Sequence, residues 1–227
     1  MDGRRAVAER EPPRARKSTG NSPLTVPGGT EYFEGRARSR GFSAPAGVDE
    51  AGRGPLAGPV VAAAVILPPG YAHPGIRDSK KLSPRRRELL YPVIARDAVA
   101  FGIALATHEE IDSLNILRAS LLAMRRAVEA LSVPADFLFV DGNRRVPCDV
   151  PQETLVGGDG RCLSVAAASI LAKVARDRIM VEYDRLYPGY GLSGHKGYPT
   201  REHFEAIRRL GPSPIHRRTF RGVFPGP

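Results

Sequence analysis

The sequence predicts an α/β protein with a mixed central β-sheet, flanked by helices and followed by a C-terminal helical segment. Two observations carry this prediction. Short runs rich in β-branched residues or alanine alternate with longer segments in which apolar residues recur every three or four positions. The first two predicted strands are joined by a short glycine-rich segment, which favours an antiparallel pair, whereas helices stand between several of the later strands.

Local patterns indicate the first elements. A strand begins near Val48, and the apolar run 60–67 forms a second strand. Ser83 followed by Pro84 has the residue types preferred at the cap and in the first turn of a helix, and the apolar residues that follow share one face. The stretch 99–106 predicts a third strand.

A capping box marks the next helix. Thr107 and Glu110 have the types and the spacing that close a first turn, and the apolar period continues to Val128, so we predict one long amphipathic helix. A later helix over about 163–186 contains small residues at 166–169, which allow a close approach to the sheet. The other predicted elements are strands over 137–141 and 153–156 and a helix over about 200–210, ended by Gly211 and Pro212.

The chain divides into an extension and one domain. Residues 1–45 contain scattered charge, several prolines and glycines and few aromatic residues, without a sustained apolar period. Such a segment buries too little surface to offset its ordering entropy, so we predict a disordered basic extension. It is either dispensable or a non-specific aid to nucleic-acid binding. Residues 46–227 form the predicted domain, including its C-terminal helical region.

The charge balance favours a polyanionic partner. The 34 Lys and Arg residues exceed the 24 Asp and Glu residues and give a net charge of +10. Nucleic acid is the first candidate. A GC-rich coding bias would also enrich arginine, so charge alone does not separate a nucleic-acid surface from a solvated basic one.

Several classes are excluded by composition. The longest apolar run, 60–67, is far shorter than the roughly 20 residues of a membrane-spanning helix. The N-terminus is charged and lacks the apolar core of a secretory signal. The two cysteines, Cys148 and Cys162, provide neither a disulfide framework nor a four-cysteine zinc site. We therefore expect a cytoplasmic protein without a membrane partner.

Acidic residues lie at predicted strand ends or in glycine-rich loops. They are Asp49 with Glu50, Asp141, and Asp159. Carboxylates gathered at one edge of a sheet repel by roughly 4 kcal/mol at about 4 Å. A hard divalent cation removes this cost, and a pair of Mg²⁺ or Mn²⁺ ions promotes attack on a phosphodiester. Aspartates also end strands simply to start turns, so each one is ambiguous by itself.

The adjacent pair Asp49 and Glu50 raises a geometric difficulty. On a regular strand, neighbouring side chains face opposite sides of the sheet. We therefore expect a local distortion if both residues share a site, and Gly52 and Gly54 would permit it.

Five motifs, in the same order along the chain, resemble bacterial ribonuclease HII. They are GVDEAGRGPLAGP at 47–59, DSKKL at 78–82, FVDG at 139–142, SVAAASILAKV at 164–174 and HKGYPT at 195–200. The resemblance covers residue 47 to about residue 220. It implies a ribonuclease H-like fold and an endonuclease, with 46–227 as its catalytic domain. The implied substrates are the RNA strand of RNA–DNA hybrids and single ribonucleotides embedded in duplex DNA, cut to leave 5′-phosphate and 3′-hydroxyl ends.

The resemblance also implies roles for particular residues. Four carboxylates would bind two Mg²⁺ or Mn²⁺ ions, one generating hydroxide and the other stabilising the departing 3′-oxygen. They are Asp49, Glu50, Asp141 and Asp159. Backbone groups of Gly52, Arg53 and Gly54 would sense the ribose 2′-hydroxyl, and Tyr198 would stack on the neighbouring deoxyribose.

Other polar residues lie in or near these motifs. Asp177 is a rival to Asp159, but its place along a helix favours a surface pair with Lys173. The histidines His195, His203 and His216 lack zinc spacing, so we expect packing or backbone contacts. A monomer is implied by the resemblance. The proposed phosphate contacts are Ser79, Lys80, Asn115, Ser169 and Lys173, with solvation as the competing explanation for the two lysines.

Rival functions make different predictions. Gly52-x-Gly54-x-x-Ala57 partly matches a dinucleotide fingerprint, but the segment that follows reads as a strand rather than the required helix. A basic nucleic-acid-binding module without catalysis would use the carboxylates structurally. A related integrase-like or Holliday-junction nuclease would share the acidic cluster, but it would not require a 2′-hydroxyl.

Overall fold

The protein folds around one five-stranded sheet in the order β3-β2-β1-β4-β5. The structure is a computed structural model, and it describes residues 32–76 and 79–224. β1 pairs antiparallel with β2 and parallel with β4, which confirms the predicted mixed sheet and the antiparallel first pair. The strands are β1 (Pro45–Ala51), β2 (Val60–Ile66), β3 (Ala100–Ala106), β4 (Phe137–Asp141) and β5 (Gln152–Leu155).

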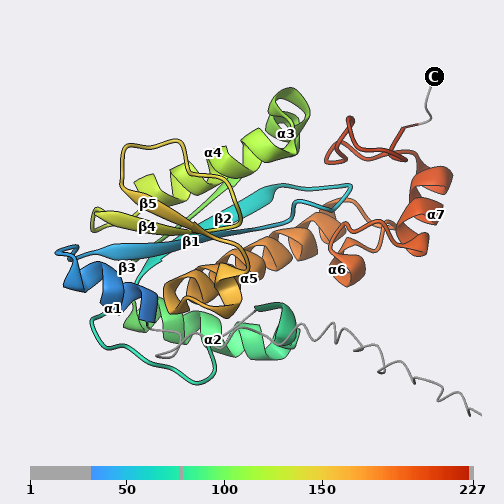
Figure 1. The fold of residues 1–227 in the computed structure, drawn as a ribbon. Coiled ribbons are helices and arrows are strands. Elements are labelled where there is room, and N and C mark those ends of the chain that lie inside the picture. Colours follow the sequence, from blue (N-terminus) through green and yellow to red (C-terminus); the bar gives the residue numbers. More distant parts are fainter. Residues whose placement is uncertain (1–31, 77–78, 225–227) are drawn as a thin grey trace, which may run out of the picture.

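Helices cover both faces of this sheet (Figure 1). On one face α4 packs over β1, β2 and β3, and on the other α5 packs over β1 and β2 with α2 beside it. The helices are α1 (Tyr32–Ser39), α2 (Pro84–Asp97), α3 (His108–Leu114), α4 (Ile116–Glu129), α5 (Leu163–Leu186), α6 (Leu192–His195) and α7 (Arg201–Leu210), with 3₁₀ turns η1 (Ser79–Lys81) and η2 (Gly158–Gly160).

The strand alternation divides the core into two layers. Ala62 and Ala64 of β2 pack with the α4 side, whereas Ala63 and Val65 pack with α5. The small residues predicted at 166–169 are all buried in α5. β1 and the start of α5 approach closely, since a Cβ placed on Gly47 of β1 would lie 2.2 Å from the carbonyl carbon of Ser164. Backbone therefore meets backbone where the sheet and α5 join.

The single long helix predicted after Thr107 is wrong, because the chain forms two helices. The predicted capping box of Thr107 and Glu110 is present and begins α3. Asn115 then takes φ 70° and ψ 162°, which no helix residue adopts, and its side-chain oxygen accepts from the N–H groups of Leu117 and Arg118. The side chain thus begins α4 with a new cap.

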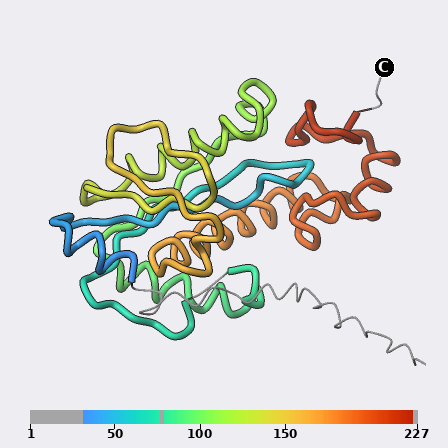
Figure 2. The backbone as a smooth tube through the Cα atoms, viewed as in Figure 1, coloured from blue at the N-terminus to red at the C-terminus, as the bar shows by residue number. Residues whose placement is uncertain are grey.

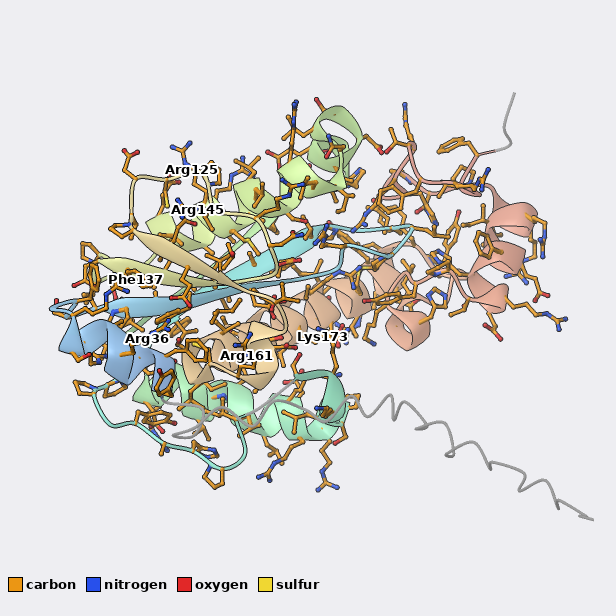
Figure 3. All side chains as sticks on the ribbon, viewed as in Figure 1. Arg36, Arg125, Phe137, Arg145, Arg161 and Lys173 are labelled. Atoms are coloured by element: carbon orange, nitrogen blue, oxygen red, sulfur yellow. The ribbon has the colours of Figure 1, made fainter. Side chains whose placement is uncertain are left out.

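The predicted disorder is wrong for residues 32–45, and residues 1–31 lie outside the described part of the chain. Residues 32–39 form α1, whose Phe33 is buried against Phe139 of β4. The guanidinium carbons of Arg36 and Arg161 lie 5.2 Å and 5.5 Å from the centre of the Phe33 ring (Figure 3). Contacts with distant aromatic residues hold this short helix, and a local apolar period does not reveal them.

The C-terminal residues form a small unit at one end of the sheet. Figure 2 shows the segment between β1 and β2 lying beside the last part of the chain. The backbone N–H of Gly58 donates to the carbonyl oxygen of Ile215 at 2.9 Å, and the backbone N–H of Arg217 donates to the carbonyl oxygen of Leu56 at 2.8 Å. Gly211 ends α7 as predicted. In the described stretches, no helix has the length and apolarity needed to cross a membrane.

Candidate active site

The carboxyl ends of two neighbouring parallel strands bring three acidic residues together. Asp49 and Glu50 are near the end of β1, and Asp141 ends β4. They open on a pocket of about 240 Å³. All but two of the predicted site residues line it: Asp49, Glu50, Gly52, Arg53, Gly54, Ser79, Lys80, Asp141, Ser169, Lys173 and Tyr198.

Asp49 is the most enclosed of the three, with 3% of its surface exposed. The backbone N–H of Glu50 donates to its Oδ1 at 2.7 Å. Burial raises the pKa of Asp49 well above its ordinary value, and repulsion from Glu50 and Asp141 adds to this, while a hydrogen bond from Ser169 opposes it. The Ser169 hydroxyl also lies 2.8 Å from the hydroxyl of Ser79, so η1 and α5 meet beside Asp49.

Glu50 and Asp141 are coupled to each other and to nearby cations. Burial raises the pKa of Glu50, the Arg53 guanidinium at 3.3 Å opposes it, and Asp141 raises it further. Burial also raises the pKa of Asp141, against a hydrogen bond of 2.7 Å that the Gly158 N–H donates to its Oδ1. The site is an acidic cluster whose repulsion is only partly neutralised.

Asp159 adjoins this cluster but does not line the pocket. It lies buried in η2, and its Oδ2 accepts from the Lys80 ammonium at 3.1 Å. Repulsion from Asp159 also reaches the Asp141 carboxylate. Burial lowers the pKa of Lys80, but the hydrogen bond to Asp159 and the other carboxylates raise it above its usual value overall. Lys80 therefore stays charged among the acids.

The expected strand distortion is absent. Pairing between β1 and β2 continues in register through Asp49, Glu50 and Ala51. Pairing between β1 and β4 stops earlier, at Val48. Beyond Val48, β1 has no backbone pairing with β4. Glu50 lines both the main pocket and a second pocket beside α4. The two residues share a site because they lie where the paired sheet ends.

The proposed ribose-recognition residues line the same pocket as the carboxylates. A Cβ placed on Gly54 would lie 3.6 Å from the ring of Tyr198, so the loop after β1 and the Tyr198 loop face each other. Tyr198 has 42% of its surface exposed. The Lys173 ammonium, on α5 in Figure 3, lies 5.8 Å from the centre of the Tyr198 ring. Gly54, Lys173 and Tyr198 therefore lie close together among the residues that line the pocket.

Asn115 is the second predicted residue outside the main pocket. Its Oδ1 is used to cap α4, which leaves the amide Nδ2 as its donor for any further partner. Asp177 pairs with Lys173 at 2.7 Å, as expected for a helix-surface residue four positions away. Burial lowers the pKa of Lys173, and Asp177 opposes this shift.

The sequence analysis missed an arginine that supports the site. Arg87 is buried and donates through Nη1 to the carbonyl oxygens of Ser79 at 2.8 Å and Leu82 at 2.5 Å. It thereby holds the turn that carries Ser79 and Lys80. A signal existed in the sequence, because Arg87 shares a helix face with the apolar residues Leu90 and Ile94.

The histidines make backbone contacts in the C-terminal unit, as expected. His216 Nδ1 accepts from the Ser213 N–H at 2.9 Å, and its Nε2 lies 3.1 Å from Nε2 of His203. His203 Nδ1 lies 2.9 Å from the carbonyl oxygen of Tyr198. Burial lowers the pKa of His216 to about 4, with repulsion from His203 adding to it. The chain of contacts thus ends at the Tyr198 loop.

Comparisons with known proteins agree with this architecture. The family model described as Ribonuclease HII matches residues 46–223. The chain is 59% identical over 192 residues to the ribonuclease HII of Syntrophotalea carbinolica, covering 85% of this chain and 92% of that one. It is 60% identical over 191 residues to the ribonuclease HII of Geobacter sulfurreducens, covering 84% and 88%.

Solved structures share the fold. The ribonuclease H2 of Pyrococcus horikoshii has a TM-score of 0.67 at 27% identity, covering 80% of this chain and 95% of that one. Bst-RNase HIII in complex with Mn²⁺ has a TM-score of 0.60 at 19% identity, covering 82% and 70%. The mixed sheet, with acidic residues at its strand ends, therefore defines a metal-dependent nuclease of the ribonuclease H-like class. Within that class, the chain belongs to the ribonuclease HII family.

The donor set fits the hard divalent ions on which ribonuclease H enzymes depend. Asp49, Glu50 and Asp141 supply carboxylate oxygens, the ligands that Mg²⁺ and Mn²⁺ prefer. Their mutual repulsion calls for opposite charge, which Arg53 and Lys80 supply in this structure. Across residues 32–76 and 79–224, no group of three or more His, Cys, Asp or Glu side chains is already arranged to bind a metal ion.

Proposed function

We propose that this enzyme hydrolyses the phosphodiester on the 5′ side of a ribonucleotide, in RNA–DNA hybrids and at single ribonucleotides embedded in duplex DNA. The products carry 5′-phosphate and 3′-hydroxyl ends. One observation carries the proposal: carboxylates from two adjacent strand ends share a pocket with the Gly52–Gly54 loop and Tyr198. Reactive and ribose-selective groups are therefore within reach of one nucleotide.

In this proposal the four carboxylates hold two Mg²⁺ or Mn²⁺ ions. They are Asp49, Glu50, Asp141 and Asp159. Bound ions would supply an activated water and would neutralise charge on the departing 3′-oxygen. Glu50 and Asp159 each have a cationic partner in this structure, Arg53 and Lys80, that orients the carboxylate. Asp49 is fixed by the Glu50 N–H and by Ser169.

Ribose selection is assigned to the loop after β1 and to Tyr198. Gly52 and Gly54 have no side chain to separate their backbone from the pocket, and the Arg53 side chain pairs with Glu50. Their peptide groups can approach a sugar closely enough to contact its 2′-hydroxyl. Tyr198 presents an exposed ring to the neighbouring deoxyribose.

Phosphate binding is assigned to hydroxyl, ammonium and amide donors around the pocket. Ser79 and Ser169 lie together beside Asp49, and Lys80 and Lys173 lie on the same pocket. Asn115 would contribute from the start of α4, outside the pocket. The net charge of +10 supports a polyanionic substrate.

We further propose a cytoplasmic, monomeric enzyme. Cys148 and Cys162 are both free thiols, which suits a reducing compartment. Light scattering after size-exclusion chromatography would measure the mass directly. A stable dimer would contradict the monomer assignment without affecting the site.

The test is cleavage of a duplex that contains one ribonucleotide, with Mg²⁺, Mn²⁺ or a chelator. Asp141→Asn should reduce cleavage by at least about 100-fold while leaving duplex binding intact, because metal support is lost but the basic surface remains. Asp149→Asn, in the β4–β5 loop outside the pocket, is the matched control. Undiminished cleavage by D141N would show that the carboxylates are structural. Equal cleavage of an all-DNA duplex would favour the integrase-like class.

A further inference from the structure

Two fully buried guanidinium groups lie beneath the loop that follows β1. Arg176 on α5 and Arg217 after α7 each have 0% of their surface exposed. Within the described residues, neither forms an ion pair with a carboxylate. Burial lowers the pKa of Arg176 to about 10, and burial with repulsion from Arg176 lowers that of Arg217 to about 9. Both groups are thus charged at neutral pH. An unpaired buried charge is costly, so the fold must gain something specific from each group.

Both arginines bind backbone carbonyl groups of one short segment, residues 52–59. Arg217 donates through Nη2 to the oxygen of Gly52 at 2.6 Å and through Nη1 to the oxygen of Arg53 at 2.9 Å. The remaining contacts are Arg217 Nε to Gly58 at 3.0 Å, Arg217 Nη2 to Pro59 at 3.3 Å, Arg176 Nε to Pro59 at 3.1 Å and Arg176 Nη2 to Ala57 at 3.3 Å.

The direction of these bonds fixes the direction of the opposite peptide groups. The described chain contains no cis peptide bond. In a trans peptide the N–H points opposite to the C=O. Because Arg217 draws the Gly52 and Arg53 carbonyls into the core, the N–H groups of Arg53 and Gly54 are aimed away from it. Residues 52–54 line the pocket, so two successive donors face the substrate side.

A second observation shows how closely the loop is seated on these arginines. Gly52 has φ of +100°, and a Cβ placed on it would lie 2.0 Å from Nε of Arg176. The loop backbone therefore rests directly on a guanidinium. Nη1 of Arg176 is buried without a hydrogen-bond partner, so its charge is poorly neutralised. That charge strengthens the attraction between the loop and a phosphodiester backbone.

We propose that Arg217, supported by Arg176, is a positioning residue for ribonucleotide selection, because its planar fork holds the Gly52–Arg53–Gly54 backbone with its donors aimed at the sugar. This inference rests on the proposed function and names the residues on which its selectivity depends. A lysine preserves the charge but cannot bind Gly52, Arg53 and Gly58 together. We therefore expect ribonucleotide selectivity to depend on the planar guanidinium of Arg217 more than on its positive charge.

The experiment compares Arg217→Lys with the wild type and with Arg209→Lys. Arg209 is an exposed arginine that also donates to a carbonyl group, that of Gly189. Two ratios are measured. One is kcat/KM for a duplex with a single ribonucleotide against the same duplex of DNA alone, and the other is the Kd ratio of the two duplexes in a chelator. R217K should lower both ratios about 10-fold or more while R209K leaves them unchanged. Unchanged ratios in folded R217K would overturn the proposal.

A measurement on the wild type keeps the test independent of folding defects. Amide hydrogen exchange at Arg53 and Gly54 should slow when the ribonucleotide duplex binds in chelator, and slow much less with the DNA duplex. Equal protection by both duplexes would contradict the inference even if R217K does not fold. A wild type that neither cleaves nor prefers the ribonucleotide duplex would instead refute the proposed function.

Discussion

The Glu34 carboxylate accepts a hydrogen bond from the backbone N–H of Ser164 at 2.7 Å, so α1 caps a helix 130 residues later in the chain. The N-cap residue of α5, Cys162, provides no side-chain acceptor, and its thiol donates to the same Glu34 oxygen at 3.2 Å. The carboxylate also lies at the positive end of the α5 dipole. The helix that carries Ser169 and Lys173 is therefore anchored from outside the matched family region, which begins at residue 46.

Glu34→Ala should lower the free energy of unfolding by about 1–2 kcal/mol, because α5 loses its cap and the dipole its counter-charge. Urea unfolding followed by circular dichroism measures this change. Glu205→Ala, on the surface of α7, is the control. If the two variants unfold at the same urea concentration, the cap contributes nothing to stability.

Gly52 and Gly54 should respond differently to alanine. Gly52 has a positive φ and no room for a Cβ, whereas the nearest atom to a Cβ on Gly54 is at 3.6 Å. We expect Gly52→Ala to lower the free energy of unfolding by about 2–3 kcal/mol and Gly54→Ala by less than about 1 kcal/mol. Thermal and urea unfolding of G52A and G54A measure the two changes in stability. Equal stability of the two variants would contradict the close seating of the loop on Arg176.

Asn115 combines strain with a possible substrate contact. Its φ of 70° and ψ of 162° are tolerated mainly by glycine, and glycine caps a helix nearly as well as asparagine. Asn115→Gly should therefore keep or raise stability, by up to about 1 kcal/mol. Asn115→Ala keeps the strain, loses the cap and should be about 1 kcal/mol less stable than the wild type.

The N115G variant also tests the proposed phosphate contact of Asn115. If Nδ2 of Asn115 binds substrate, N115G should raise KM for the ribonucleotide duplex although the folded protein is at least as stable. An N115G enzyme with unaltered KM and kcat would assign Asn115 to helix capping alone.

Acid should destabilise the protein through His216. Burial lowers the pKa of this histidine to about 4 from an ordinary value of 6.5, so the unfolded chain takes up a proton first as the pH falls. Its contribution to stability is complete above pH 6.5 and decreases between 6.5 and 4, by up to about 3 kcal/mol.

Urea unfolding at several pH values measures this dependence. His216→Asn keeps an acceptor for the Ser213 N–H but cannot titrate in this range, so its stability should fall less steeply with acid. His203, whose pKa burial also lowers, would account for a remaining slope. The raised pKa values of Asp49, Glu50 and Asp141 act in the opposite direction, so the histidine effect is read from the difference between the two proteins. Equal pH dependence of the wild type and H216N from pH 6.5 to 4 would show that His216 does not control acid unfolding.

Most of the predicted site residues line one pocket, and each belongs to a short motif that can be recognised in the sequence. Asp49 lies near the end of β1 and Asp141 ends β4, and the carboxyl ends of parallel neighbours meet at one edge of the sheet. One residue that sequence reasoning missed, Arg217, acts through distant backbone, whereas Arg87 binds carbonyl groups nearby in the chain. Arg217 binds carbonyl groups more than 150 positions earlier in the chain, as the separation of 165 residues to Gly52 shows. No local pattern marks such a partner.

The errors have different causes. The break at Asn115 depends on one backbone conformation inside an otherwise unbroken apolar period, so periodicity could not reveal it. The helix α1 is short and weakly amphipathic, and its order comes from Phe33 and Glu34 meeting strands and α5 far along the chain. A local backbone conformation with its own cap decided the first case, and tertiary contacts decided the second.

The backbone contact between Gly47 and the start of α5 affects how the site tolerates change. Asp49 is two positions beyond that contact on the strand, and Ser169 is five positions beyond Ser164 on the helix. No side chain separates the two main chains. Substitutions in the surrounding core can therefore lower the free energy of unfolding without altering the distance between Asp49 and Ser169. Catalytic geometry should therefore drift little among relatives whose interior residues differ, while any residue larger than glycine at position 47 would wedge the strand and the helix apart.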